Sequence, residues 1–167
     1  SWLLGVRFLA TSLVLGIVFW RKLRANLTLS TIRAGAVLGL LIFAAYWFQT
    51  VGLVYTTPGK NAFLTAIYCV IVPFLFWGIA KKRPTAYNIA AAVICIAGVG
   101  LVSLSGDALT IGFGDGMTIV CGFLFAAHIV ATSIFAKTKD VVVLTVYQCF
   151  FTGLLGLLVG ALTEPAP

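Results

Sequence analysis

The sequence has few charged side chains, and very few of them are acidic. Only 9% of its 167 residues are charged, with four Asp or Glu against eleven Lys or Arg and a net charge of +7. Soluble domains carry about 25% charged residues, and 62% of this chain is hydrophobic. A water-soluble fold of this size could not bury so much apolar surface. The composition therefore excludes an ordinary soluble domain and indicates an integral membrane protein.

Motifs for catalysis, metal binding and nucleic-acid binding are also missing. There is no G-x-S-x-G and no H-E-x-x-H, and the acids fall between the apolar runs or at their ends. The four cysteines lie in four different apolar runs without a C-x-x-C pair, which is typical of buried small apolar side chains. We expect no enzyme, no cofactor, no metal site and no nucleic-acid partner. An intramembrane enzyme that pairs Ser133 or Cys121 with His128 has no motif to support it.

Long apolar runs are what the sequence does have, and they predict an all-α bundle of six transmembrane helices. A run such as 34–54 is about 31 Å long as an α-helix, which is the thickness of a hydrocarbon core. Helices are required because the open edges of a sheet cannot be satisfied in lipid. The predicted spans are residues 2–20, 34–54, 61–80, 86–104, 115–136 and 141–161.

The basic residues are concentrated in alternate loops. Segments 21–33, 81–85 and 137–140 hold nine Lys or Arg, whereas the intervening loops hold only Lys60. The positive-inside rule makes these three segments cytoplasmic and the Ser1 end external, in a multi-pass protein of the cell inner (plasma) membrane. The first run starts almost at Ser1 without the pattern of a signal peptide, so we expect a further helix upstream.

Two of the runs are similar to each other. LLGVRFLATSLVLG, residues 3–16, resembles VLTVYQCFFTGLLG, residues 143–156, and a shift of 141 places Arg7 on Gln148 and Thr11 on Thr152. The two runs are five helices apart and therefore cross the membrane in opposite directions. This arrangement is typical of the inverted repeats that surround a central site in transporters.

A longer stretch carries a family resemblance. Residues 52–104 resemble part of an EamA domain of the drug/metabolite transporter (DMT) superfamily; their sequence is GLVYTTPGKNAFLTAIYCVIVPFLFWGIAKKRPTAYNIAAAVICIAGVGLVSL. Three short motifs also match: VRF in the first run, GD at the start of the fifth run and YQ in the sixth run. The resemblance implies ten spans in two inverted five-helix repeats, of which this chain would cover about spans two to seven. Residues 1–105 would be the first repeat without its first helix, and residues 114–167 would begin the second repeat with two helices.

The same resemblance implies a function. EamA-type proteins are secondary transporters, often exporters, that move small metabolites or drug-like solutes by alternating access around a central cavity. The implied partners are a small-molecule substrate, the lipid bilayer and the missing helices of the full-length protein, and a homodimer is left open. The alternative is a non-transporting membrane scaffold or helper subunit whose Gly-rich faces, such as that of Gly35 and Gly39, bind another chain.

Polar side chains recur at helical spacing inside the apolar runs. The stripes contain Tyr46 with Gln49, Asn61 with Thr65 and Tyr68, and Thr118 with Cys121, Phe125, His128 and Thr132. Each stripe fits either packing with an interhelical hydrogen bond or the wall of a cavity. The candidates for a substrate cavity are Arg7, Tyr46, Gln49, Asn61, Thr65, Tyr68, His128 and Gln148.

Several of the polar residues, and one proline, allow two interpretations each. His128, the only histidine, is either a neutral hydrogen-bonding group or a proton-coupling group that titrates near neutral pH. Arg7 and Lys60 either snorkel outward or face the cavity, with Lys60 at its mouth. Pro73 removes a helix hydrogen bond in mid-span and predicts a kink, either accommodated by neighbouring helices or used in gating. We expect Asp115 to cap the fifth run.

Overall fold

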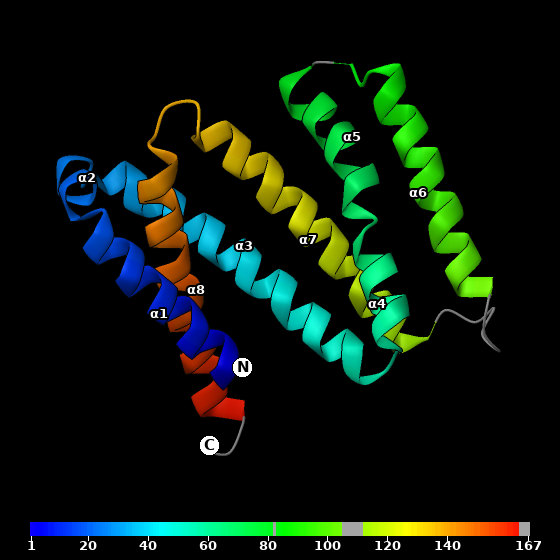
Figure 1. Cartoon of the computed structure of the whole chain (residues 1–167), viewed down its shortest axis with the longest axis horizontal. Helices are drawn as coiled ribbons and strands as arrows, with labels where there is room; N and C mark the ends of the chain where they lie inside the picture. Colours follow the sequence, from blue (N-terminus) through cyan, green and yellow to red (C-terminus); the bar gives the residue numbers. More distant parts are fainter. Residues whose placement is uncertain (82, 105–111, 164–167) are drawn as a thin grey trace. The chain divides into compact units, whose positions relative to one another are not determined.

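The computed structural model describes residues 1–81, 83–104 and 112–163, and in these residues the chain is all-helical (Figure 1). Three parts of the predictions lie outside the described residues. They are Lys82 of the second basic loop, position 105 at the predicted end of the first repeat, and residues 164–167 of the predicted second repeat. The helices are α1 (Trp2–Val18), α2 (Trp20–Ala25), α3 (Leu29–Val54), α4 (Pro58–Thr65), α5 (Tyr68–Ala80), α6 (Ala86–Leu104), α7 (Phe113–Phe135) and α8 (Val141–Thr163).

The helices pack into two compact units. Unit 1 contains Ser1–Phe43 and the described residues from Ala131 onward, and unit 2 contains Ala44–Val130. Helices α3 and α7 each contribute one part to either unit. Unit 1 therefore holds α1, α2, α8, the first part of α3 and the end of α7, whereas unit 2 holds α4, α5, α6 and the remaining parts of α3 and α7.

Four segments are long and apolar enough to cross a membrane, judged by length and composition. They correspond to the second, third, fifth and sixth predicted runs, and their bounds are Leu29–Val54, Pro58–Ile79, Phe113–Phe135 and Val141–Thr163. The first and fourth runs are shorter apolar helical stretches, Trp2–Val18 and Ala86–Gly98. A multi-pass, all-α membrane protein is therefore confirmed, while the six predicted spans become four long helical segments and two shorter ones.

The structure also moves the ends of two predicted spans. The sequence predicts a first span to residue 20, but α1 ends at Val18 and the short basic helix α2 follows in the predicted loop. The second span is predicted from residue 34, but α3 begins at Leu29. Thr28 stands immediately before α3, and its hydroxyl accepts a hydrogen bond from the N–H of Thr31 at 3.3 Å. A capping side chain, rather than the first residue of the apolar run, sets where this helix begins.

In unit 1, α1 and α8 lie side by side in opposite directions (Figure 1). A Cβ atom added to Gly5 would come within 2.7 Å of the backbone N of Leu157, and one added to Gly156 within 2.8 Å of the Cα of Gly5. Farther along the pair, the hydroxyl of Ser12 donates to the carbonyl of Val146 at 3.0 Å. Small residues at the crossing let the two backbones touch, which is how helices gain packing energy in lipid.

The same unit brings α3 against α8 through the predicted glycine face. A Cβ on Gly35 would collide with the Cβ of Tyr147, and one on Gly39 would lie 2.7 Å from the Cβ of Phe151. The hydroxyl of Thr152 donates to the carbonyl of Gly39 at 3.1 Å. Beside this contact, Ala34, Leu38 and Leu144 form a buried apolar core. The close helix approach predicted from Gly35 and Gly39 is therefore present, and its partner is α8 of the same chain.

In unit 2, the third predicted span is not one helix. The sequence predicts a continuous helix over 61–80, but α4 ends at Thr65 and α5 begins at Tyr68. At the break, backbone hydrogen bonds span three residues, as in a 3₁₀-helix. The N–H of Ile67 donates to the carbonyl of Leu64 at 3.2 Å, and the N–H of Cys69 donates to the carbonyl of Ala66 at 2.9 Å. Pro73, where we expected the irregularity, lies inside α5.

Neighbouring helices cover this break. The thiol of Cys95 on α6 donates to the carbonyl of Ala66 at 3.5 Å. On α7, a Cβ added to Gly122 would lie 2.5 Å from a methyl carbon of Ile67, so only a glycine fits at this point without a shift. Irregular backbone at membrane depth is tolerated where protein buries it, and here α6 and α7 do so.

Candidate functional site

A cluster of buried polar side chains joins three helices of unit 2. We call Gln49 of α3, Asn61 and Thr65 of α4, and Thr118 of α7 the polar junction. The amide nitrogen of Asn61 donates to the hydroxyl of Thr118 at 2.9 Å and to the carbonyl of Gln49 at 3.3 Å. The amide nitrogen of Gln49 donates to the hydroxyl of Thr65 at 3.2 Å, and that hydroxyl donates to the carbonyl of Asn61 at 2.8 Å.

The polar junction is shielded from the surroundings. Asn61 is 4% exposed, Thr65 is 7% exposed and Thr118 is fully buried. Each of these polar groups has a partner, as buried polar groups require, since an unsatisfied one is costly in an apolar setting. Such a network fixes the register of α3, α4 and α7 more tightly than apolar contact alone.

Close glycine contacts bring α3 and α7 together next to the junction. A Cβ on Gly52 would lie 2.5 Å from the hydroxyl oxygen of Thr118, and one on Gly114 would lie 2.7 Å from the carbonyl oxygen of Gly52. The hydroxyl of Thr118 donates to the carbonyl of Gly114 within its own helix at 2.8 Å. Thr118 therefore lies close to Gly52 of α3 and bonds to Asn61 of α4.

Aromatic rings form one wall beside the junction. The ring of Phe125 on α7 meets Tyr46 of α3 edge to face, with centroids 5.3 Å apart, and lies 6.3 Å from the ring of Tyr68 at the start of α5. Edge-to-face contact is a favoured geometry for aromatic pairs. Phe125 thus joins the two tyrosines that the sequence singled out. His128 follows three residues later on α7, on the same side of the helix, and is half-buried.

A nearly buried ion pair adjoins the polar junction. The ammonium of Lys60 lies 2.6 Å from Oδ2 of Asp115, and the two side chains are 17% and 5% exposed. The hydroxyl of Thr56 donates to Oδ1 of Asp115 at 2.8 Å, and the N–H of Gly112 donates to Oδ2 at 3.0 Å. These residues line a depression of about 480 Å³ together with Val54, Tyr55 and Thr57. The pair directly precedes the junction in the chain, since Lys60 comes before Asn61.

The ion pair changes how two residues are interpreted. Asp115 does serve the start of α7, because it accepts the N–H of Gly112 immediately before that helix. It also binds Lys60, a partner that neither interpretation of this lysine included. Sequence reasoning missed the pair because 55 residues separate the two positions. It likewise left out Thr118, although this residue lies on a stripe that the sequence analysis did identify.

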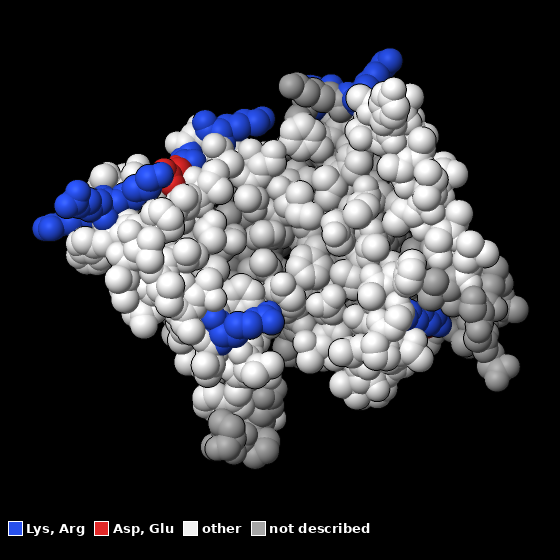
Figure 2. Space-filling view, in the orientation of Figure 1, with Lys and Arg blue, Asp and Glu red and all other residues white. Residues whose placement is uncertain are grey.

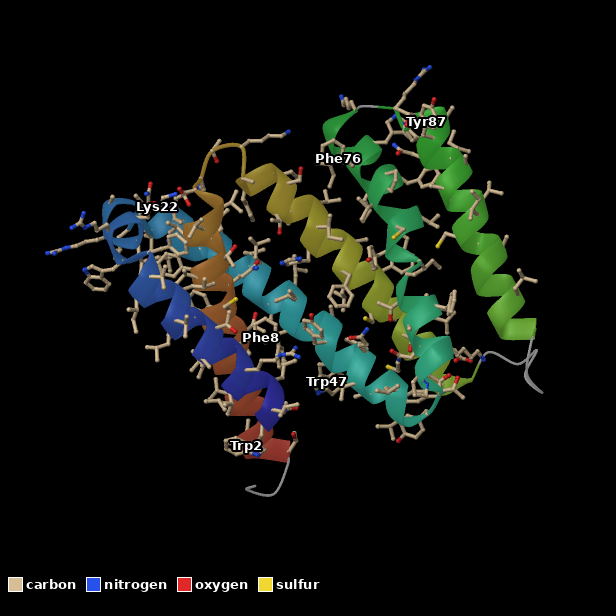
Figure 3. The ribbon with its side chains drawn as sticks, viewed as in Figure 1. Trp2, Phe8, Lys22, Trp47, Phe76 and Tyr87 are labelled. Atoms are coloured by element: carbon tan, nitrogen blue, oxygen red, sulfur yellow. The ribbon has the colours of Figure 1, made fainter. Side chains whose placement is uncertain are left out.

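The remaining candidates lie elsewhere. Arg7 is exposed on α1, with its guanidinium 5.2 Å from the ring centroid of Phe8, whose side chain is labelled in Figure 3. Gln148 is half-buried on α8. Both belong to unit 1, whereas the polar junction belongs to unit 2, so their place in a shared cavity stays a prediction. Among the described residues, no group of three or more His, Cys, Asp or Glu side chains could hold a metal ion.

Long apolar helices with polar groups buried between them define a multi-pass membrane protein. The sequence profile of the EamA-like transporter family matches residues 1–104, and the chain belongs to this family of membrane transporters. The family predicted from residues 52–104 is therefore confirmed.

Two curated relatives extend the match. Both are described as uncharacterized transporters of Archaeoglobus fulgidus. One is 31% identical over 118 residues, which cover 70% of this chain and 37% of the relative. The other is 32% identical over 145 residues, which cover 83% of this chain and 49% of the relative. The chain thus spans less than half the length of these relatives. Among solved structures, none matches the chain significantly.

Proposed function

We propose that this chain is part of a secondary transporter of the inner membrane that exports a small metabolite or drug-like solute by alternating access. The observation that carries the proposal is the polar junction, in which Asn61, Thr65 and Thr118 are buried between apolar helices. Buried polar groups at membrane depth are costly and in transporters they mark the substrate path. The wall of Tyr46, Phe125 and Tyr68 adds apolar and aromatic surface beside them.

The interrupted third span supports the same proposal. In many transporters the substrate site is formed where a membrane helix is discontinuous, near the middle of the bilayer. Here the break between Thr65 and Tyr68 separates two residues that the sequence marked as cavity candidates. The full protein would complete the site with the helices beyond this chain, in two inverted five-helix repeats divided near residues 105–114. The basic segments 21–33, 81–85 and 137–140 would face the cytoplasm.

The packing of the glycine face counts against the scaffold alternative. A scaffold would present Gly35 and Gly39 to another chain, but both glycines are buried against Tyr147 and Phe151 of α8. No room remains on this face for a second helix. We therefore retain the transporter as the single proposed function.

The test is transport by the full-length protein that contains this chain. Untargeted metabolite profiling of cells with and without the protein identifies a solute, and its flux is then measured in membrane vesicles. We expect Gln49→Leu, Tyr68→Phe and Gln148→Leu to reduce flux, whereas Thr50→Val should not. Thr50 is a suitable control because it is exposed and its hydroxyl bonds only within α3, to the carbonyl of Tyr46 at 2.7 Å. Unchanged flux in all three variants would contradict a cavity at these residues.

A further inference from the structure

A small hollow lies at the basic end of unit 1, between the start of α3 and the end of α7. Its volume is about 350 Å³. From α3 it is lined by residues that share one face of the helix: Leu29, Ser30, Arg33, Ala34 and Val37. From the end of α7 and the turn after it, it is lined by Phe135 and Lys139. The N–H of Lys139 bonds to the carbonyl of Phe135 at 3.0 Å, so the helical turn continues and sets Lys139 above Phe135.

The rim of this hollow is positively charged. Arg33 and Lys139 both line it, and none of the described lining residues is acidic. The ammonium of Lys139 donates to the hydroxyl of Ser30 at 2.9 Å, which holds the charge at the rim. Asp140 directly follows Lys139 in the sequence. Its carboxylate, however, accepts the N–H of Val142 at 2.8 Å and lies 3.6 Å from the ammonium of Lys22. The hollow therefore carries two cations without a carboxylate of its own.

The wall below the rim is apolar. Val37 lies one turn beyond Arg33 on α3 and is 48% exposed, and Phe135 lies one turn before Lys139 and is half-buried. Because α3 is a candidate membrane span that starts at Leu29, the hollow lies where such a span leaves the hydrocarbon and enters the headgroup layer. Figure 2 shows further basic side chains gathered over α2, with one acidic side chain among them. They include Lys22, which Figure 3 labels.

This arrangement has the polarity of a phospholipid. Cations and a hydroxyl at the rim match a phosphodiester headgroup, and the exposed apolar wall matches the first part of an acyl chain. A soluble anion would use the cations but gain nothing from Val37 and Phe135. We propose that this hollow binds the headgroup of an anionic phospholipid, with Arg33, Lys139 and Ser30 on the phosphate and an acyl chain along Val37 and Phe135. The proposal depends on the chain being a membrane protein and not on the identity of the transported solute.

The test uses native mass spectrometry of the purified full-length protein, titrated with phosphatidylglycerol and, separately, with phosphatidylcholine. We expect tighter binding of phosphatidylglycerol to the unaltered protein. In Arg33→Gln/Lys139→Gln, this binding should weaken about thirtyfold, as for two cations near a lipid surface. The matched control is Arg24→Gln/Lys137→Gln. It removes the same amount of charge from the basic segments of unit 1, at positions outside the hollow. It should change binding less than about twofold, because exposed charges that do not touch the bound headgroup are screened by salt.

Four results would overturn the proposal. Equal weakening in both double variants would mean that the whole basic surface attracts lipid and the hollow does not. Equal binding of the two lipids would remove the role of the anionic headgroup. Displacement of phosphatidylglycerol by glycerol 3-phosphate at similar concentration would show that a soluble phosphate is the ligand. A photoactivatable phosphatidylglycerol gives a readout without mutation, because it should label peptides containing residues 29–37 or 135–139; labelling elsewhere alone would also exclude the site.

Discussion

The two units of the chain solve the same packing problem in different ways. In unit 1, glycines let the helices approach closely. Gly5, Gly39 and Gly156 have no side chain, so the backbones touch at these positions. Its buried interhelical hydrogen bonds from Ser12 and Thr152 run from a hydroxyl to a backbone carbonyl. Its ion pair, between Lys22 and Asp140, is exposed. Unit 2 also has close glycine contacts, at Gly52 and Gly114. It adds buried hydrogen bonds between side chains and a nearly buried ion pair, and its third predicted span is interrupted.

The buried network of polar side chains is therefore what distinguishes unit 2 from unit 1. A glycine contact has no alternative arrangement, because moving one helix away simply loses the packing. A hydrogen bond between Asn61 and Thr118 can be replaced by a bond to a solute or to another helix. The comparison therefore predicts that variants at the glycine contacts of unit 1 change stability alone, whereas variants in the polar junction of unit 2 change both stability and transport.

The ion pair of unit 2 should give the largest effect. Lys60→Met leaves the carboxylate of Asp115 without its cation in a setting where it is 5% exposed. We expect the free energy of unfolding of the full-length protein to fall by about 3 kcal/mol, the low end for a broken buried pair. Thermal or denaturant unfolding in detergent measures it.

Two controls define this result. Lys60→Met/Asp115→Asn removes both charges and should recover most of the loss, because no charge stays unpaired. Lys22→Met breaks the exposed contact with Asp140, where the side chains are 54% and 29% exposed, and should have little effect. A loss in the double variant as large as in Lys60→Met would mean that the pairing itself is not what matters.

The glycine contacts of unit 1 should come next. In Gly5→Ala the added Cβ lies 2.7 Å from the backbone N of Leu157, so α1 and α8 must separate. Overpacking of this kind costs about 1–3 kcal/mol, and we expect a lower unfolding temperature with unchanged flux per folded molecule. Gly16→Ala is the matched control in the same helix, since its Cβ would lie 3.9 Å from a methyl of Val146, an ordinary contact. Equal destabilisation by both alanines would contradict tight packing at Gly5.

The polar junction should show a smaller loss of stability together with a loss of transport. Asn61→Leu removes two hydrogen bonds, to Thr118 and to the carbonyl of Gln49. Interhelical hydrogen bonds in membranes contribute about 0.6 kcal/mol on average, so a total loss of about 1–2 kcal/mol is expected. Solute flux should fall at least tenfold, about 1.4 kcal/mol in a barrier. Full flux in a folded Asn61→Leu protein would separate the junction from the transport path.

The smallest effect should come from Asp140 and depend on pH. The backbone N–H of Val143, then that of Val142 and the ammonium of Lys22, hold the pKa of Asp140 below its usual value. A lowered pKa in the folded state means that ionised Asp140 contributes stability above the unfolded pKa of about 3.9. The contribution is lost as the pH falls through the folded pKa. Asp140→Asn should therefore lower the unfolding temperature slightly at pH 7 and not at more acidic pH; an equal shift at both would rule out the charge as the cause.

The sequence predicts the helices of this chain well, because a long apolar run in lipid has no other stable conformation. It predicts the glycine face equally well, since Gly35 and Gly39 can serve close approach and little else. It fails at the break between Thr65 and Tyr68, where the residues are Ala66 and Ile67 and nothing in them disfavours a helix. The contacts that accompany the break come from Cys95 and Gly122 on two other helices, which the local sequence does not reveal.

The sequence predicts one side of the candidate site but not the residues that lie opposite. Tyr46, Gln49, Asn61, Thr65 and Tyr68 were found from helical spacing, and the structure gathers them around α3, α4 and the start of α5. The partners that complete the cluster, Thr118 and Phe125, come from a helix more than fifty residues later in the chain. Spacing within one helix shows which residues share a face, but it does not show which face of a distant helix lies opposite.

The break at Ala66 and Ile67 has a consequence for how movement passes along the third span. A continuous helix acts as a rod, so a tilt at one membrane surface is carried to the other. Here Lys60 and Asn61 join α4 to α7, and both α4 and α5 pack on α6. The hydrogen bond and the ion pair to α7 come from α4, whereas α5 meets α7 through the ring contact of Tyr68 with Phe125. The third span is thus two helices held by different contacts, not one continuous rod.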